Sequence, residues 1–129
     1  MHVVLTGATG FVGSHLLAEL TKQGHECLVL TRPGSKRAAQ NRLPGVAYRP
    51  TQLGSPTDLE LALRGADAVI NLIGILNERG WGGKGFRAAH VAPVAALIAA
   101  CSANHVRRFV QVSAINAGAG SSHYLQSKG

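Results

Sequence analysis

Residues 3–13 read VVLTGATGFVG. An apolar run leads directly into three glycines, Gly7, Gly10 and Gly13, and a helical pattern starts immediately after them. The glycines let the backbone turn tightly and approach a ligand, while the following helix offers free N–H groups and the positive end of its dipole. A chain with 16 glycines contains some such spacings by chance. The weight therefore comes from the strand before, the helix after and a second strand about 20 residues later, which together predict a phosphate-binding loop.

Apolar strand-like runs alternate with helical patterns along the whole chain. Near-continuous apolar strands separated by helices indicate a parallel sheet that is covered on both faces. The predicted fold is therefore a doubly wound α/β (Rossmann) domain, a dinucleotide-binding domain that occupies residues 1–129. We expect strands at residues 2–6, 26–31, 46–49, 68–73 and 108–113, and helices at residues 11–23, 35–42, 57–64, 86–103 and 123–128.

Prolines bear on the course of two of these helices. Ser55 and Pro56 are expected to be the N-cap and the first residue of the helix at 57–64. Pro93 falls inside the helix expected at 86–103, where it either kinks that helix or marks its true start. Only five strands are counted, whereas such domains usually have six. We therefore expect the chain to be the N-terminal portion of a longer protein that also carries a substrate-binding part.

Composition limits the class of protein. The chain has 129 residues, 46% of them apolar, enough for one hydrophobic core. No apolar run approaches the ~18 residues of a membrane span, so no transmembrane segment is expected. The start lacks a basic region and a cleavage site, and Cys27 and Cys101 lie in apolar stretches, where two buried free thiols are expected in preference to a disulfide. These features predict a cytoplasmic location.

The chain is basic, with a formal net charge of +7. Its basic residues are scattered, and the one local cluster, at residues 32–42, has no interleaved aromatic residues. An anionic cofactor therefore explains the cluster better than nucleic acid, which is not predicted as a partner. The six histidines and two cysteines show no ligand spacing, and no metal site is predicted.

The residue after the second strand bears on the choice of cofactor. A carboxylate there would bind the adenosine ribose hydroxyls and select NAD, but this chain has Arg32, followed by Ser35, Lys36 and Arg37. This arrangement suits a 2′-phosphate, so NADP(H) is the preferred cofactor, with NAD(H) still compatible. The alternative is that Arg32 is an ordinary solvated loop residue.

Three further strand ends face the same edge of a parallel sheet. They supply Gln52-Leu53 after the third strand, Leu72–Gly74 after the fourth, and Ser113-Ala114 after the fifth. Gly74 would let the backbone approach the ribose and pyrophosphate of the cofactor, or it merely starts a loop, and both can hold together.

Tyr124 and Lys128 stand four residues apart in the last predicted helix, so they share one face. An ammonium beside a phenol stabilises the phenolate and can also hold ribose hydroxyls. Such a tyrosine can carry the proton that accompanies hydride transfer at a carbinol. The spacing alone is weak, since it also describes an ordinary exposed helix turn.

Four motifs follow one another along the chain: TGATGFVG at 6–13, DAVINLIG at 67–74, RFVQVSA at 108–114, and the Tyr124/Lys128 pair. Together they resemble the extended and atypical short-chain dehydrogenases/reductases, the NAD-dependent epimerase/dehydratase superfamily. The segments IGILNE at 73–78 and SHYLQSKG at 122–129 are similar to the branch of the nucleotide-binding accessory subunit of respiratory complex I. The resemblance covers nearly the whole chain.

The resemblance assigns roles to individual residues. It implies that Gly7, Gly10 and Gly13 surround the pyrophosphate, with backbone N–H groups added by Phe11 and Val12. It also implies that the tyrosine of the last motif is the catalytic acid/base and that the lysine is its partner.

Two positions depart from the pattern of the superfamily. Gln52-Leu53 replaces an acidic residue that usually touches the adenine, although an amide can still hydrogen-bond there. Ala114 stands where many catalytic members have Ser or Thr, so Ser113 either takes over that role or only braces the loop. Cofactor binding is unaffected by these departures, whereas turnover is called into question.

Two functions from different classes follow. The first is an NADP(H)-dependent oxidoreductase or epimerase-like enzyme that acts on a carbinol or carbonyl of an unidentified small molecule. The alternative is a non-catalytic nucleotide-binding module, associated peripherally with a respiratory or other membrane complex, and a nucleic-acid module is a distant third. The residues assigned to the cofactor are Gly7, Thr9, Gly10, Phe11, Val12, Gly13, Arg32, Gln52, Leu53, Leu72, Ile73, Gly74 and Lys128, and those assigned to catalysis are Tyr124, Lys128 and Ser113.

Overall fold

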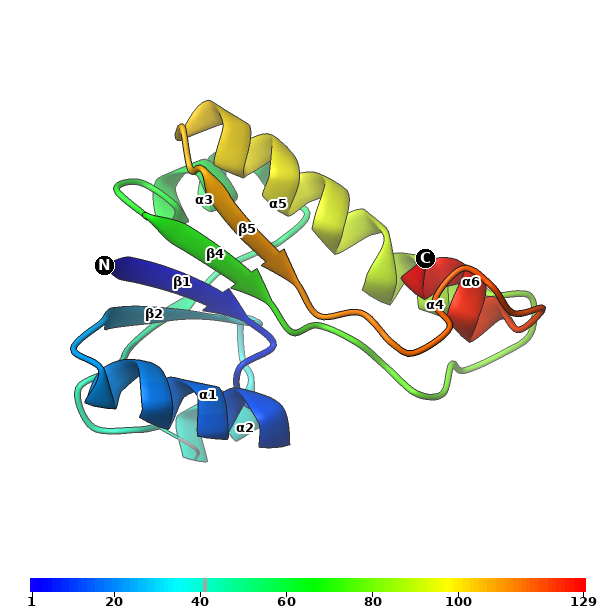
Figure 1. Ribbon diagram of the computed structural model, residues 1–129, viewed down its shortest axis with the longest axis horizontal. Coiled ribbons are helices and arrows are strands. Elements are labelled where there is room, and N and C mark those ends of the chain that lie inside the picture. Colours follow the sequence, from blue (N-terminus) through cyan, green and yellow to red (C-terminus); the bar gives the residue numbers. More distant parts are fainter. Residues whose placement is uncertain (41) are drawn as a thin grey trace.

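The computed structural model describes residues 1–40 and 42–129 and is built around a five-stranded parallel sheet in the order β3-β2-β1-β4-β5 (Figure 1). The predicted doubly wound α/β fold is confirmed. The strands are β1 (His2–Thr6), β2 (Glu26–Thr31), β3 (Ala47–Pro50), β4 (Ala68–Asn71) and β5 (Arg108–Gln111). The helices are α1 (Phe11–Lys22), α2 (Lys36–Gln40), α3 (Pro56–Ala62), α4 (Lys84–His90), α5 (Ala92–Ala103) and α6 (His123–Lys128).

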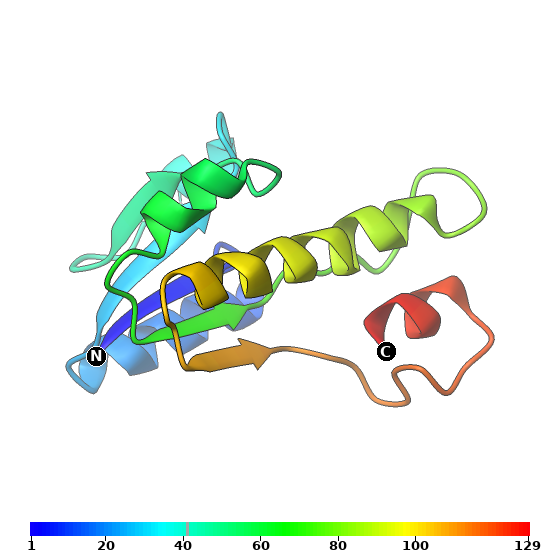
Figure 2. The same cartoon turned by 90° about the horizontal axis from the view of Figure 1, so that it is seen from above.

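Helices cover both faces of the sheet, with α1 on one side and α3 and α5 on the other (Figures 1 and 2). Successive side chains of a strand point to opposite faces, so β1 contributes to two cores. Val3 and Leu5 pack with Leu17 of α1. Val4 packs with Leu59 of α3 and Leu97 of α5. This two-sided burial explains why the strands read as continuous apolar runs.

The strand order reverses at β1. The chain passes outward through β2 and β3, then returns to place β4 on the other side of β1. The connections leaving the carboxyl ends of β1 and β4 therefore diverge, which opens a crevice between them. The fold thus fixes where a ligand can enter before any side chain is considered.

A buried amide joins the three strands at this edge. Asn71, only 1% exposed, accepts a hydrogen bond from Thr6 Oγ1 at 2.5 Å and donates one to Gln111 Oε1 at 2.7 Å. Its Oδ1 also accepts from the backbone N–H of Ile73 at 3.1 Å. One side chain therefore connects β1, β4 and β5 and turns the chain out of β4.

Most predicted element boundaries lie within two residues of the structure. The fourth strand was expected to reach residue 73 but ends at Asn71, because the Ile73 N–H turns to the Asn71 side chain instead of a neighbouring strand. The fifth strand ends at Gln111 rather than residue 113. The helix expected at 35–42 is shorter, and its position 41 lies outside the described residues. The Ser55 cap is confirmed, since its hydroxyl accepts from Asp58 N–H.

The prediction of a single helix at residues 86–103 is wrong. Two helices, α4 and α5, are separated at Val91. Pro93 lies in the first turn of α5 and has no N–H to donate to the preceding turn, so the helix restarts there. Because α4 precedes it, Pro93 interrupts the predicted helix and starts only its second part, α5, rather than marking the start of the whole helix.

By length and composition alone, the 20-residue segment Lys84–Ala103 is apolar enough to cross a membrane. The expectation that no stretch approaches that length was therefore too strong. In this structure the α5 part of the segment packs on the sheet, where Leu97, Ala100 and Cys101 are buried.

Cys27 and Cys101 are both free and buried, as expected. They belong to different cores, since Cys27 packs on the α1 face and Cys101 on the α5 face. The sheet lies between them, and burial raises the pKa of both thiols.

Replacing Asn71 with Ala should lower the free energy of unfolding by about 2–3 kcal/mol, because Thr6, Gln111 and the Ile73 N–H lose a buried partner. Urea denaturation measures the change. Asn77→Ala, in the exposed loop after β4, is the matched control and should shift stability by less than about 0.5 kcal/mol. Equal effects of the two substitutions would show that the Asn71 network does not hold the strands.

Candidate functional site

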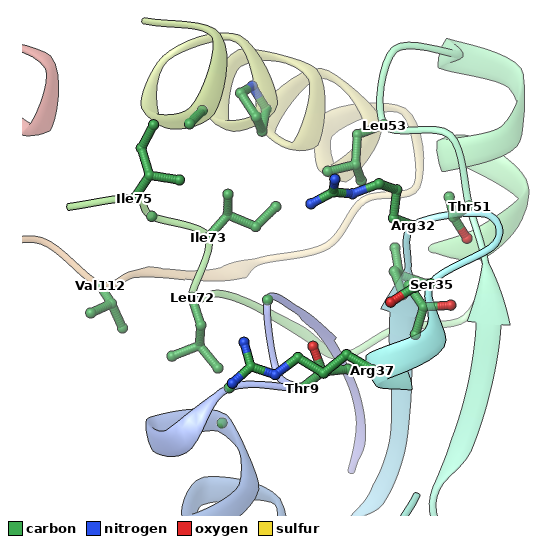
Figure 3. Close-up of a pocket in the computed structure, with 18 of the residues that line it drawn as sticks. Thr9, Arg32, Ser35, Arg37, Thr51, Leu53, Leu72, Ile73, Ile75 and Val112 are labelled. Atoms are coloured by element: carbon green, nitrogen blue, oxygen red, sulfur yellow. The ribbon is translucent and has the colours of Figure 1, made fainter. Parts of the chain in front are cut away.

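A cavity of about 1130 Å³ lies at the carboxyl edge of the sheet, where the strand order reverses (Figure 3). Every strand contributes to its wall, through its last residues or the loop that follows. The lining residues come from six segments of chain: Gly7 and Thr9–Gly13; Leu30–Pro33 with Ser35 and Arg37; Thr51–Gly54; Leu72–Leu76; Ala88, Ala89 and Pro93; and Val112. The fold alone, with five strands ending at one edge, brings together residues that are far apart in sequence.

The three glycines of the opening motif differ in what a side chain at each position would meet. Gly7 has a positive φ of 69°, and a Cβ there would lie 2.7 Å from the backbone N of Ile73. A Cβ on Gly13 would overlap the backbone of Ala8, so Gly13 allows α1 to pack closely on the loop. A Cβ on Gly10 would have only Gly7 O nearby, at 3.7 Å. Gly10 is therefore not required by the packing of the chain itself, and it keeps the cavity floor open to a ligand.

The amino end of α1 faces the same space. Gly10 is the N-cap and makes no side-chain cap, and the first turn has no acidic residue. The N–H groups of the first turn therefore have no intrahelical acceptor, and the positive end of the helix dipole is unopposed. Phe11 is 79% exposed and Val12 59% exposed, so two apolar side chains flank these donors at the cavity mouth.

Two arginines extend across the cavity from its β2 side toward the end of β4 (Figure 3). Arg32 follows β2 directly, and Arg37 is the second residue of α2. The start of this short helix is held by Ala38 N–H, which donates to Ser35 Oγ at 3.3 Å. The lining residues that the structure describes include no Asp or Glu, so these two guanidinium groups give the cavity its charge. Arg37 was noted beside Arg32 in the sequence but was not assigned to the site, and its position on the inward face of a short helix is what brings it there.

The end of β3 is held by an acidic residue that does not enter the cavity. Asp58 forms an ion pair with Arg49 at 3.2 Å and accepts the Gln52 N–H at 2.8 Å. The backbone of Gln52 is thus fixed, and Leu53 presents its side chain to the cavity (Figure 3). This loop offers an apolar wall and an amide where the resemblance led one to look for a carboxylate.

Lys128 links α6 to the edge of the cavity. Its Nζ donates to the backbone O of Val112 at 3.0 Å and lies 3.4 Å from the point that a Cβ on Gly74 would occupy. Val112 and Gly74 both line the cavity. Burial lowers the pKa of the Lys128 ammonium below its usual value. Gly74 therefore gives the ammonium room beside the end of β4.

Tyr124 and Ser113 stand further from the cavity and are not among its lining residues. The ring of Tyr124 packs edge-on against Phe86 at 5.8 Å and against His90 at 5.6 Å between ring centroids. Ser113 Oγ donates to the backbone O of Lys128 at 3.4 Å, which is the bracing geometry of the two roles considered for it. The twelve predicted cofactor residues between Gly7 and Gly74 all line the cavity, whereas Tyr124, Lys128 and Ser113 do not. Of these three, Lys128 lies beside the lining residues Gly74 and Val112.

Two polar residues near this edge were not predicted. Glu78 closes the loop before α4 by accepting the N–H groups of Gly83, Gly85 and Phe86. Desolvation acts to raise the pKa of Glu78, but these donors outweigh it and the pKa is lowered. His90, the last residue of α4, is buried against α6. Nothing in the local spacing of either residue pointed to its partners, which come from the folded arrangement.

Comparison with known proteins places the chain in a family. A model of the NAD(P)H-binding family matches residues 7–128. Protein Rcp of Vibrio cholerae is 43% identical over 72 residues, covering 56% of this chain and 33% of that protein. Epimerase family protein ML0860 of Mycobacterium leprae is 30% identical over 117 residues, covering 88% of this chain and 36% of that protein. The chain thus spans about a third of the length of these relatives.

Solved structures share the fold. A UDP-galactose 4-epimerase superposes with a TM-score of 0.83 at 20% identity, covering 99% of this chain and 48% of that one. UDP-glucuronic acid 4-epimerase from Bacillus cereus, in complex with NAD, gives a TM-score of 0.77 at 21% identity, covering 99% and 49%. These two structures show the fold alone, and the complex I branch suggested by the sequence is not confirmed by the relatives or the structures. The chain belongs to the NAD(P)H-binding family, among the epimerase/dehydratase-like proteins of the short-chain dehydrogenase/reductase superfamily.

Proposed function

We propose that this chain is the NADP(H)-binding part of an oxidoreductase or epimerase-like enzyme that transfers a hydride at a carbinol or carbonyl carbon. The observation that carries the proposal is the cavity at the strand reversal, which is lined by the glycine loop and two arginines and has the Lys128 ammonium beside two of its lining residues, Gly74 and Val112. A dinucleotide has its phosphates in the middle and a reactive ring at one end. The glycine loop suits the phosphates, the two arginines suit an anionic group on the adenosine side, and the Lys128 ammonium suits the ribose beside the reactive ring.

The residues present fit the pyrophosphate. Gly10 leaves space that any Cβ would fill, and the free N–H groups of the first turn of α1 face that space. Backbone donors at a helix N-terminus bind phosphate oxygens without a charged side chain. We assign these contacts to Gly10, Phe11, Val12 and Gly13.

The arginines support a preference for NADP(H) over NAD(H). Arg32 and Arg37 reach into the same part of the cavity, and within the described residues neither is in an ion pair with a carboxylate. Two free guanidinium groups suit a 2′-phosphate, whereas NAD(H) selection normally uses a carboxylate at the end of β2.

The nicotinamide ring, when bound, supplies or accepts the hydride. The residues of this chain position it and handle the proton. Lys128 is held beside Gly74 by Val112 O, where its ammonium can donate to ribose hydroxyls. Tyr124 lies one turn earlier on α6, its ring fixed by Phe86 and His90, and it is our candidate for the acid/base.

A second function is favoured by one specific observation. The Ser113 hydroxyl is directed to the backbone of Lys128, and the next residue is Ala114, so this strand end places no free hydroxyl next to Tyr124. A chain of this kind can bind the dinucleotide without using it. We therefore keep, as the second candidate, a non-catalytic NADP(H)-binding module that associates with a respiratory or other membrane complex.

The glycine loop gives a test of binding that is separate from folding. Gly10→Ala should leave thermal stability nearly unchanged but weaken NADPH binding at least tenfold, because its methyl group enters the space assigned to the phosphates. Titration of the fluorescence of the reduced nicotinamide measures affinity. Gly13→Ala is the matched control for packing and should destabilise the fold itself by overlapping Ala8. Full NADPH affinity in Gly10→Ala would place the phosphates elsewhere.

Cofactor preference is tested at Arg32. Arg32→Ala should weaken NADP(H) binding by about 10- to 100-fold, the effect of removing a charge-assisted hydrogen bond, and change NAD(H) binding by less than about threefold. Lys36→Ala removes a neighbouring cation that does not line the cavity, and both affinities should stay near wild type. An equal loss for both cofactors in Arg32→Ala would contradict 2′-phosphate recognition.

Tyr124→Phe separates the two candidate functions. If Tyr124 moves the proton, this substitution should abolish rescue of a strain that lacks the gene, since acid/base groups contribute about 10²- to 10⁴-fold to rate. NADPH affinity should be unchanged in the same variant. Gln126→Ala, on the exposed side of α6, is the control and should rescue fully. Full rescue by Tyr124→Phe with intact binding would favour the non-catalytic module.

A further inference from the structure

His90 is a buried imidazole at the end of α4, only 4% exposed, with a partner on each ring nitrogen. Its Nε2 lies 3.0 Å from the backbone N of Ile75, in the loop that follows β4. Its Nδ1 lies 2.8 Å from Ser127 Oγ, on α6. One side chain therefore bridges a loop that lines the cavity and the helix that carries Tyr124 and Lys128.

The partners fix which nitrogen carries the hydrogen. The Ile75 N–H is always a donor, so Nε2 must accept and carries no hydrogen. Nδ1 then bears the hydrogen and donates to Ser127 Oγ, whose own hydrogen goes to the backbone O of Tyr124 at 2.8 Å. The donors thus run in one direction, from the β4 loop through the imidazole into α6.

The surroundings of the ring favour this neutral form. Lys128 and Tyr124 face it from α6, Phe86 packs against it from its own helix, and the β4 loop presents the Ile75 N–H and Gly74. Burial first, and the Lys128 ammonium second, lower the pKa of His90 below its usual value. A Cβ on Gly74 would lie 3.7 Å from His90 Nε2 and 3.4 Å from Lys128 Nζ, so the imidazole and the ammonium lie in the same small space beside Gly74.

We propose that His90 is a positioning residue: its neutral Nδ1–H form locks α6 onto the loop after β4 and thereby holds the Lys128 ammonium at the edge of the dinucleotide cavity. The contribution to cofactor binding rests on the proposed function, because it requires Lys128 to contact the bound dinucleotide. The lock itself requires only the two hydrogen bonds.

Protonation of His90 would open this lock. A hydrogen on Nε2 would oppose the Ile75 N–H, and a second cation would stand beside Lys128. Because the folded pKa is depressed, the stabilisation is present above the usual pKa of about 6.5 and is lost as the pH falls through the lower, folded value. The position of Lys128 should therefore depend on pH in acid solution, with His90 as the titrating group.

The lock is tested first in the full chain without cofactor. Nitrogen-15 NMR of the imidazoles should show His90 as the Nδ1–H tautomer at pH 7.5. Amide exchange in α6 should accelerate in His90→Leu, which removes both hydrogen bonds, and should stay near wild type in His90→Gln, whose amide retains a donor and an acceptor. An Nε2–H tautomer, or α6 exchange unaffected in His90→Leu, would overturn the proposal.

The link to Lys128 is tested by NADPH affinity. We expect about tenfold weaker binding in His90→Leu, the effect of leaving a buried N–H without a partner. In His90→Gln, binding should be within about threefold of wild type at pH 7.5, and the loss of affinity between pH 7 and pH 5 should be smaller than in wild type. His105→Asn, an exposed histidine at the opposite end of the sheet, should change neither property.

A double-mutant cycle shows whether His90 acts through Lys128. If it does, His90→Leu combined with Lys128→Met should bind NADPH no more weakly than Lys128→Met alone. Additive losses would contradict positioning and would indicate an independent contribution.

If wild-type protein binds no NADPH, the proposed function fails, whereas the tautomer of His90 and the amide exchange of α6 still decide whether the lock exists. If His90→Leu does not fold, the pH response of His90→Gln decides the link.

Discussion

The close approach of Gly7 to the Leu72–Ile73 backbone is the constraint on which the site depends. β1 and β4 are the central neighbours where the strand order reverses, and their loops must part on opposite sides of a narrow gap. A side chain at position 7 would lie 2.7 Å from the Ile73 N, and the left-handed φ of 69° disfavours any residue with a Cβ. The Asn71 amide then fixes the same point by holding Thr6, Gln111 and Ile73. Backbone proximity and one buried amide together set the floor of the cavity, and the contacts of the other strand ends follow from it.

Much of this was predictable because it is local. The apolar runs of five strands, the glycine loop and the Ser55 cap each involve residues a few positions apart, where spacing carries the information. Several of the errors come from partners that are distant in sequence. β4 ends early because the Asn71 side chain, already held by Thr6 65 residues away, takes the Ile73 N–H. His90 meets Ser127 37 residues away, and no periodicity within α4 indicates that contact. Arg37 was missed for a smaller reason, since the direction of a five-residue helix is set by the turn before it.

The buried side chains of Asn71 and His90 fix the backbone more narrowly than apolar packing can. An apolar core tolerates small rotations of a helix, whereas a hydrogen bond fails when its angle or length departs from a narrow range. Asn71 satisfies donors and acceptors from β1, β5 and the loop after β4, and His90 from a loop and a helix. Each therefore specifies one arrangement of backbone segments. Both lie within two or three residues of cavity-lining positions, where a shift of less than an ångström would change what a bound dinucleotide contacts.

The cavity and α6 form two parts of the site that are joined by few contacts. The glycine loop, Arg32 and the end of β4 line a dinucleotide cavity without any contribution from the Tyr124 ring. Among the described residues, the connections between that cavity and the helix of the proposed acid/base include the Lys128 ammonium beside Gly74 and Val112 O, the Ser113 hydrogen bond and the His90 bridge. A substitution in α6 can therefore remove chemistry and leave binding intact, whereas a substitution at Gly10 removes both. Loss of the proposed chemistry would thus require change only in α6 and the strand end beside it, and Ala114 stands at that strand end.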